Sequence, residues 1–242
     1  MKAMTQLFIG TLVCLSVSLL VNYVHYIKKE EALEEVAVLK KHSKSCDLKD
    51  SRIDCMAKTL ITVYGLSKWE AHYYSVIFDD FSQEYDTPWE IYPAVIRIES
   101  NFKCTSVSGK SAKGIMQILE PTGEMLAKEI GMNYMKGETL WNDFCNMILG
   151  CYYLSFNIRD KGLDGGVQTY LGGPAYMVSA KANTEVFKYL GEYKTTVAKE
   201  YKTLLYIYRG LVTEAGFSYS EMHSSKYQDS IVVDTELFSK EK

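Results

Sequence analysis

Between Leu7 and Ile27 the chain has 21 consecutive residues without Asp, Glu, Lys or Arg, LFIGTLVCLSVSLLVNYVHYI. Such a run restricts folding strongly, because at about 1.5 Å per residue a helix of this length crosses a hydrocarbon core of roughly 30 Å. Residues 1–27 are therefore predicted to form an N-terminal transmembrane helix that anchors the chain.

A cleaved signal peptide is the alternative for this run. Its apolar region should be shorter and should end in small residues of the A-x-A kind. The run ends instead in polar and aromatic residues, Asn22, Tyr23, His25 and Tyr26. A lipoprotein site at Cys14 is disfavoured, because Val13 precedes it where a small residue is expected. We therefore favour an uncleaved anchor.

Beyond the anchor the composition changes twice. Residues 28–45, KKEEALEEVAVLKKHSKS, are mostly charged and are interpreted as a helical or flexible stalk. From residue 46, stretches such as WEAHYYSVIFDDFSQEY place apolar residues every three or four positions, and the sequence has no sustained alternation typical of strands. Residues 46–216 are predicted to form one mainly α domain, and residues 217–242 a polar tail.

The amino-acid composition limits the classes of function that the chain can have. With 242 residues, 47% hydrophobic and 24% charged, the chain can bury a substantial core. Its net charge of −3 provides no basic surface for nucleic acid, and we expect neither a metal nor a cofactor. The 19 Tyr residues fit either an aromatic core or a groove that stacks against sugar rings.

Helix boundaries can be predicted from Pro and Gly. Thr87 and Pro88 resemble an N-cap and a first helical residue, so a helix of about 13 residues should run past Glu99 and hold it in the last turn. Other boundaries are expected at Pro121 (start), Gly131 (end), Gly162 (end), the break Gly172-Gly173-Pro174, and a last helix over roughly 185–209.

Glu99 is the candidate catalytic residue. On a helix it shares its face with Val95, Ile96 and Phe102. Loss of hydration would raise the pKa of this carboxyl, as a general acid near neutral pH requires. An exposed or ion-paired Glu is the structural alternative, and spacing alone does not decide between the two.

Several ordered motifs over roughly residues 70–210 resemble the lysozyme-like domain of the soluble lytic transglycosylase family. They are Glu99-Ser100-Asn101-Phe102, Val107-Ser108, Gly114-Ile115-Met116-Gln117-Ile118, the helix from Asn146 to Leu154, Thr169-Tyr170-Leu171-Gly172-Gly173-Pro174, and Glu185 with Tyr189. The resemblance implies a goose-type, SLT-like helical fold.

The resemblance also implies cleavage of the β-1,4 bond between N-acetylmuramic acid and N-acetylglucosamine in peptidoglycan, with Glu99 as the only acid and base and a 1,6-anhydro product. Asp86 and Glu120 lie beside helix caps and are interpreted as structural. By resemblance, the substrate-binding residues are Ser108, Met116, Gln117, Tyr170 and Tyr189, with Tyr189 near the Glu99 carboxylate. Core packing is the alternative for Met116.

The sequence departs from the family pattern at Leu171, where an Asn is usual, and at Ser111 and Lys113, which make the loop more polar. We expect these departures to bear on substrate preference or rate. A goose-type hydrolase and a non-catalytic glycan-binding or assembly factor of an envelope-spanning machine remain as alternatives. The extracytoplasmic substrate implies a single-pass protein of the inner membrane with a periplasmic domain.

Four cysteines lie in predicted loops or near helix ends of this exported domain, where oxidation is permitted. We expect at least one disulfide among them, with Cys46–Cys55 and Cys104–Cys145 as the favoured pairing, although sequence does not determine connectivity.

Overall fold

The computed structural model describes residues 47–180 and 184–222, except for the side chains of residues 173–190. The predicted anchor and stalk, and the end of the tail, lie outside these residues. Within the described part no helix is long and apolar enough to cross a membrane. The chain divides into two compact units between Asp50 and Ser51, and the second contains all the elements from α2 to α7.

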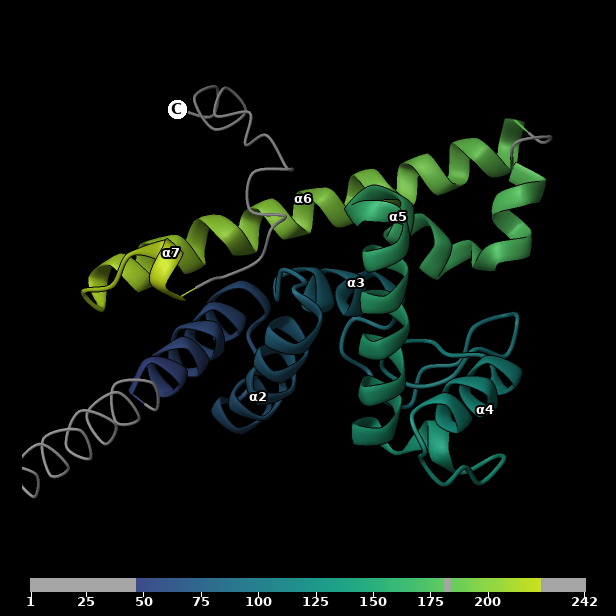
Figure 1. Ribbon diagram of the computed structural model, residues 1–242, viewed down its shortest axis with the longest axis horizontal. Helices are drawn as coiled ribbons and strands as arrows, with labels where there is room; N and C mark the ends of the chain where they lie inside the picture. Colours follow the sequence, from purple (N-terminus) through teal and green to yellow (C-terminus); the bar gives the residue numbers. More distant parts are fainter. Residues whose placement is uncertain (1–46, 181–183, 223–242) are drawn as a thin grey trace, which may run out of the picture. The chain divides into compact units, whose positions relative to one another are not determined.

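The described residues are mainly helical, as predicted, and their only β structure is a pair of isolated bridges. The elements are a helical segment at 47–64, α2 (Lys68–Tyr85), α3 (Ile91–Glu99), α4 (Glu120–Glu129), the 3-10 helix η1 (Thr139–Trp141), α5 (Asp143–Ala180), α6 (Thr184–Glu214) and α7 (Tyr219–Met222). Helix α5 packs against α2, α4 and α6, and α3 packs against α6 (Figure 1).

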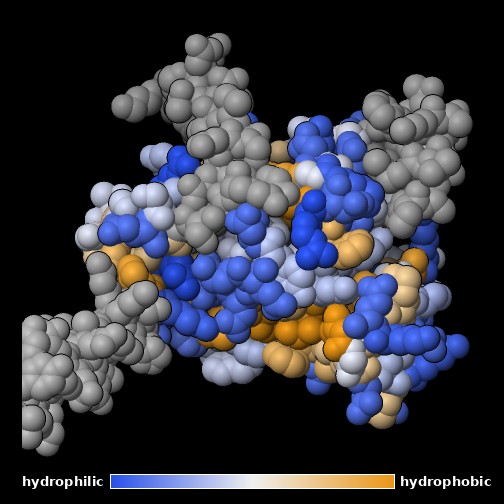
Figure 2. Space-filling model, in the orientation of Figure 1, coloured by the Kyte–Doolittle hydropathy of each residue, from blue (hydrophilic) through white to orange (hydrophobic). Residues whose placement is uncertain are grey.

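Aromatic side chains form much of the core. Trp89, Tyr92, Phe78, Tyr201 and Tyr208 are fully buried. Each such side chain contributes roughly 1.5–3 kcal/mol or more through burial. Many of the tyrosines are therefore explained by packing, while the face in Figure 2 is largely hydrophilic with a smaller apolar patch.

Helix α3 begins three residues later than predicted. Its N-cap is Glu90, and the Thr87 hydroxyl donates only a long hydrogen bond of 3.4 Å to the Tyr85 carbonyl. The segment from Pro88 forms a turn in which the Ile91 N–H donates to the Pro88 carbonyl. The predicted position of Glu99 in the last turn is confirmed, although α3 ends at this residue and does not run past it.

The other boundaries have mixed outcomes. Helix α4 ends before Gly131, whose φ of +70° suits glycine at this position. The predicted helix end at Gly162 is wrong, because α5 runs through this residue to Ala180, although its φ of +73° lies outside the right-handed helical region. The predicted break at residues 172–174 is therefore wrong, since helix propensity is a weak preference. Helix α6 extends to Glu214, beyond the predicted end.

The domain also continues past the predicted boundary at residue 216. Met222 in α7 is 1% exposed. The Tyr219 hydroxyl donates to Glu90 Oε1 at 3.3 Å, and the Arg209 guanidinium lies 4.4 Å from the Tyr219 ring centre. Residues 219–222 are thus part of the packed domain rather than of a polar tail.

The favoured disulfide between Cys104 and Cys145 is not present. Cys55, Cys104, Cys145 and Cys151 are all free thiols, and Cys46 lies outside the described residues. Cys55 is only 2% exposed, because it lies on the buried face of its helix and not in a loop. The expectation of a disulfide among the described cysteines is therefore wrong.

Candidate active site

A cleft of about 390 Å³ opens beside the end of α3. Glu99 lies in its lining, together with residues of the loop before α4, the first turn of α4 and helix α5. The lining includes Ser108, Gln117, Tyr170 and Leu171. The structure thus brings together four residues that the sequence motifs single out and one departure from the family pattern.

The Glu99 carboxyl is largely removed from water. Burial raises its pKa to about 7, and a hydrogen bond from the Tyr193 hydroxyl to Oε1, 2.7 Å long, opposes part of that rise. Val95 and Ile96 on the same helix are fully buried. At neutral pH a substantial fraction of this carboxyl is therefore protonated, as the desolvation argument from sequence predicts.

The residues that follow Glu99 determine its position. The Ser100 hydroxyl donates to the Ile115 carbonyl at 2.6 Å, which ties the end of α3 to the loop before α4 (residues 106–119, the cleft loop). Asn101 and Phe102 both have positive φ, +53° and +61°, so the chain turns sharply here. The Phe102 ring then packs 5.0 Å from the ring of Tyr64. The Ser and Phe of this motif therefore support the position of the Glu99 side chain.

Asn146 of α5 holds the loop before α4 in place through hydrogen bonds to its backbone. Its Oδ1 accepts from the Met116 N–H at 2.8 Å, and its Nδ2 donates to the carbonyls of Lys113 and Leu140 at 2.9 and 3.0 Å. Gly114 makes this approach possible, because a Cβ there would lie 2.2 Å from Asn146 Nδ2. The Gly and Asn of the motifs are therefore complementary packing partners.

Three predicted binding residues line the cleft, and each has a polar atom that is already hydrogen-bonded to the loop before α4. Ser108 Oγ accepts from the Ala112 N–H at 3.0 Å. Gln117 Nε2 donates to the carbonyls of Ser106 and Gly114 at 3.0 and 2.9 Å. The Tyr170 hydroxyl donates to the Met116 carbonyl at 2.7 Å. These bonds fix the side chains that face the cleft.

The predictions that Met116 and Tyr189 bind substrate have different outcomes. Met116 is fully buried under the loop and does not line the cleft, in agreement with the packing alternative. The Tyr189 side chain lies outside those described. Tyr193, one turn later on α6, makes the contact with Glu99 that was expected of Tyr189. Sequence reasoning missed Tyr193, although its spacing of four residues from Tyr189 was the available signal.

Tyr153 also lines the cleft, with its ring 5.5 Å from that of Tyr170, and sequence reasoning gave it no role.

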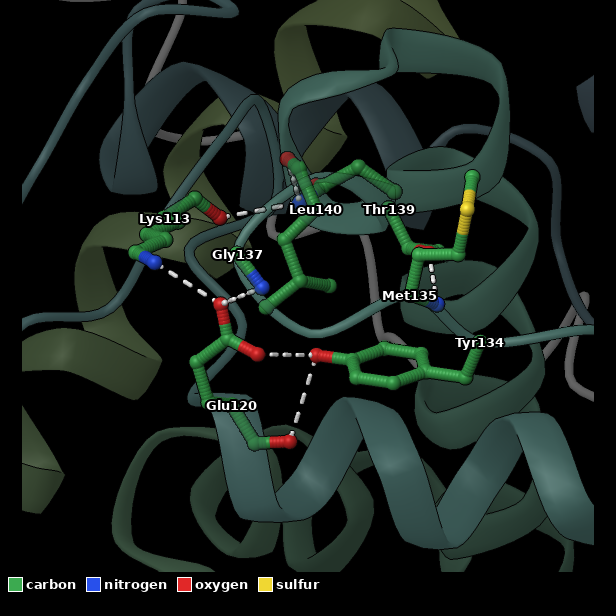
Figure 3. A network of polar contacts seen from close by, with 8 residues as sticks. Lys113, Glu120, Tyr134, Met135, Gly137, Thr139 and Leu140 are labelled. Carbon is green, nitrogen blue, oxygen red and sulfur yellow. Dashed lines mark hydrogen bonds and ion pairs between the residues drawn. The ribbon is translucent and has the colours of Figure 1, made fainter.

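Glu120 was interpreted as structural from the sequence. Its carboxylate accepts hydrogen bonds from Lys113 Nζ, the Tyr134 hydroxyl and the Gly137 N–H at 2.7, 2.6 and 3.1 Å (Figure 3). These donors lower the pKa of Glu120, so it stays ionised and is unsuited to act as an acid.

Asp86, the other carboxylate interpreted as structural, is the left-handed C-cap of α2, where its backbone N–H donates to the Ser82 carbonyl.

Comparison with protein families identifies this arrangement. Residues 77–190, from α2 to the start of α6, match the family model of the transglycosylase SLT domain. The chain carries an SLT domain. This segment contains Glu99 and every cleft residue named above, and Tyr193 follows directly after it on α6.

Two solved structures resemble the chain. The 70 kDa soluble lytic transglycosylase of Escherichia coli is 19% identical, with a TM-score of 0.47 over 73% of this chain and 30% of that one. An inactive mutant of lytic transglycosylase Slt from Pseudomonas aeruginosa is 16% identical, with a TM-score of 0.45 over 62% of this chain and 26% of that one. The chain thus spans less than a third of either length. No curated protein matches it.

Proposed function

We propose that this protein is a lytic transglycosylase that cleaves the β-1,4 bond between N-acetylmuramic acid and N-acetylglucosamine in peptidoglycan and leaves a 1,6-anhydro end. The observation that carries this proposal is that Glu99 is the only carboxylate among the described residues lining the cleft. Glycosidases that use water generally need two carboxylates. A single one suffices where the sugar supplies its own nucleophile.

In the first step, protonated Glu99 donates its proton to the glycosidic oxygen as the bond from that oxygen to C1 of muramic acid breaks. Burial keeps the pKa of this group at about 7, so the acid is available at neutral pH. The leaving N-acetylglucosamine departs with the donated proton as a neutral hydroxyl.

In the second step, the Glu99 carboxylate accepts the proton of the C6 hydroxyl, and O6 bonds to C1 to close the anhydro ring. The acid is then regenerated. The intramolecular hydroxyl competes well with water, because it is held close to the reacting carbon. Ser108, Gln117 and Tyr170 are proposed to hold the sugar, and Tyr193 to orient the carboxyl.

The product decides between this reaction and hydrolysis. Incubation of the full chain with purified peptidoglycan should release muropeptides that are lighter, by one water, than those of a goose-type hydrolase. Mass spectrometry measures this difference directly. Reducing ends in place of anhydro ends would establish the hydrolase alternative, and the absence of both would favour a glycan-binding role.

Replacing Tyr193 with Phe should shift the pH dependence of the reaction. The Tyr193 hydroxyl lowers the Glu99 pKa, so its loss raises that pKa further. Because the protonated carboxyl begins the reaction, the fall in kcat/KM above about pH 7 should move to higher pH. Tyr206→Phe, at an exposed position on the same helix, is the control and should keep the wild-type profile. A fall that begins at the same or lower pH in the Tyr193 variant would contradict this role.

The location follows from the substrate and from the uncharged run at residues 7–27. We propose a single-pass protein of the inner membrane with its N-terminus in the cytoplasm and the SLT domain in the periplasm, where its partners include envelope-spanning machinery. Alkaline phosphatase fused after Lys242 should then be active. An inactive enzyme in a stable fusion would refute this topology.

A further inference from the structure

Tyr64 is the last residue of the helical segment before α2, and it contacts three elements around the acid. Its ring packs 5.0 Å from that of Phe102, in the turn after Glu99, and the Arg97 guanidinium of α3 lies 5.8 Å from the Tyr64 ring centre. Its hydroxyl donates a hydrogen bond of 3.2 Å to Glu200 Oε2 on α6. One half-buried ring therefore supports residues on both sides of the acid in the sequence.

The Glu200 side chain shares a face of α6 with the residue that contacts the acid. Tyr193 and Glu200 are seven residues apart, about two helical turns, so their side chains leave α6 in nearly the same direction. Val197 lies between them on that face and is 1% exposed, and α6 packs against α3. The Tyr193 hydroxyl donates to Glu99 Oε1 at 2.7 Å. The face of α6 that Tyr64 contacts thus also carries the hydrogen-bond donor to the acid.

The turn after the acid needs support from its surroundings. Phe102 has a φ of +61°, which strains a residue with a Cβ and persists only where neighbouring groups hold it. The rings of Tyr64 and Tyr74 lie 5.0 and 5.9 Å from that of Phe102. Burial and the nearby Glu200 carboxylate raise the pKa of the Tyr64 phenol, so its hydroxyl stays protonated and remains a donor.

Other titratable groups near the carboxyl come from different elements. Tyr170 of α5 interacts with Glu99, and Lys110 of the cleft loop lines the same cleft. Tyr64 and Glu200 do not line the cleft. Their replacement therefore leaves the surface that meets the sugar unchanged.

We propose that Tyr64 is a positioning residue for the acid: it holds the turn after Glu99 and helix α6 together, and thereby keeps the Tyr193 hydroxyl on the Glu99 carboxyl. This inference rests on the proposed function. Tyr64, Tyr193 and Glu200 all lie outside residues 77–190, which match the SLT family model. The setting of the acid thus depends on segments that flank the matched domain.

Tyr64→Phe tests the connection to α6, because it removes the hydroxyl and keeps the ring. We expect kcat to fall about two- to tenfold with KM within about twofold, since one hydrogen bond is lost and the cleft lining is unchanged. The Tyr193 hydroxyl lowers the Glu99 pKa, so a looser contact should move the alkaline fall in kcat/KM to higher pH. Glu200→Ala removes the same hydrogen bond and should reproduce both effects.

Tyr64→Leu also removes the ring from Phe102 and should lower kcat by about 10- to 100-fold, because a small misplacement of a reacting group can cost about 10² in rate. Tyr85→Leu is the matched control. Tyr85 is a half-buried tyrosine at the end of α2, outside the cleft, with its ring 5.7 Å from Phe81 and 5.9 Å from Tyr152. This control should keep the wild-type kcat and pH profile. Urea unfolding checks each variant, and Tyr64→Phe and Glu200→Ala decide if Tyr64→Leu does not fold.

Two further measurements distinguish positioning from a general loss of stability. If Tyr64 acts through Tyr193, Tyr64→Phe/Tyr193→Phe should show the pH profile of Tyr193→Phe alone, whereas independent effects would add. NMR titration of isotope-labelled glutamate carboxyls in the full chain measures the Glu99 pKa without turnover. A higher Glu99 pKa in Tyr64→Phe than in wild type supports the inference even if no anhydro product forms. An unchanged Glu99 pKa in Tyr64→Phe and Glu200→Ala, or additive shifts in the double variant, overturns it.

Discussion

The Glu99→Gln variant is expected to lose turnover of peptidoglycan by about four orders of magnitude while it still folds and binds glycan. Gln preserves the shape of the side chain but cannot donate or accept the transferred proton. General acid–base catalysis commonly contributes about 10² to 10⁴ in rate, and here one residue performs both transfers, so the loss should lie at or beyond the upper end. Release of anhydro-muropeptides, followed by mass spectrometry, measures it.

The matched control is Glu124→Gln, an exposed residue of α4 outside the cleft, which should keep the wild-type rate. A change in folding stability should not explain the loss of turnover in the Glu99→Gln variant. The folded-state pKa is raised above its ordinary value of 4.5, so the ionised carboxylate costs stability as the pH rises through about 7. At pH 8 the Gln variant should therefore unfold no more readily than wild type. A residual rate above about a tenth of wild type would show that another group is the acid.

The reaction rate of the wild type should depend on pH through the protonation of Glu99. The protonated fraction of Glu99 is high below its pKa of about 7 and falls tenfold per unit well above it. The profile of kcat/KM should accordingly decline on the alkaline side of about pH 7. A rate that stays constant to pH 9 would be inconsistent with Glu99 as the initial proton donor.

Gly114→Ala should be the most destabilising of the single glycine substitutions in the cleft loop. A φ of +79° strains any residue with a Cβ, and the added carbon would lie 2.2 Å from Asn146 Nδ2 and 2.6 Å from the Leu140 carbonyl oxygen. Backbone strain of about 1–2 kcal/mol and overpacking of about 1–3 kcal/mol together predict a loss of roughly 2–5 kcal/mol. Urea unfolding followed by circular dichroism measures this loss.

Gly210→Ala provides the comparison on α6. Apart from its chain neighbours and the backbone of its own helix, no atom lies within 4 Å of a Cβ at Gly210, and its φ is not in the left-handed region, so the same substitution should stabilise the protein by up to about 1 kcal/mol. Gly114→Ala should also weaken glycan binding, because displacement of Asn146 releases the Met116 N–H and the Lys113 carbonyl. Equal stability of the two variants would mean that the loop does not depend on close contact with Asn146.

Local pattern was sufficient for several elements. The end of α3 at Glu99, the end of α4 before Gly131 and the helical class of the domain follow from interactions among residues close in sequence, whose spacing is visible in the chain. The apolar neighbours at helical spacing from Glu99 also predicted the direction of its pKa shift. Helix ends and shared helix faces can be predicted in this way because the geometry of a helix repeats every turn.

Boundaries set by opposing preferences were less predictable. The proline at position 88 permits a helix start, but the chain makes a turn first and α3 begins at Ile91. Gly172 and Pro174 oppose a helix, yet α5 continues through them. Each single preference is worth only one to a few kcal/mol, which packing elsewhere in a domain can outweigh.

The sequence by itself identified Glu99 as the candidate acid, the motifs around it and the end of the helix that carries it, because these depend on residues within a few turns of one another. Only the tertiary structure decided that Tyr193, 94 residues away, contacts Glu99, that Met116 lies beneath the cleft, and that Cys104 and Cys145 stay free. Such pairings join residues far apart in the sequence, so they depend on how whole helices pack against one another and not on the spacing of neighbouring residues.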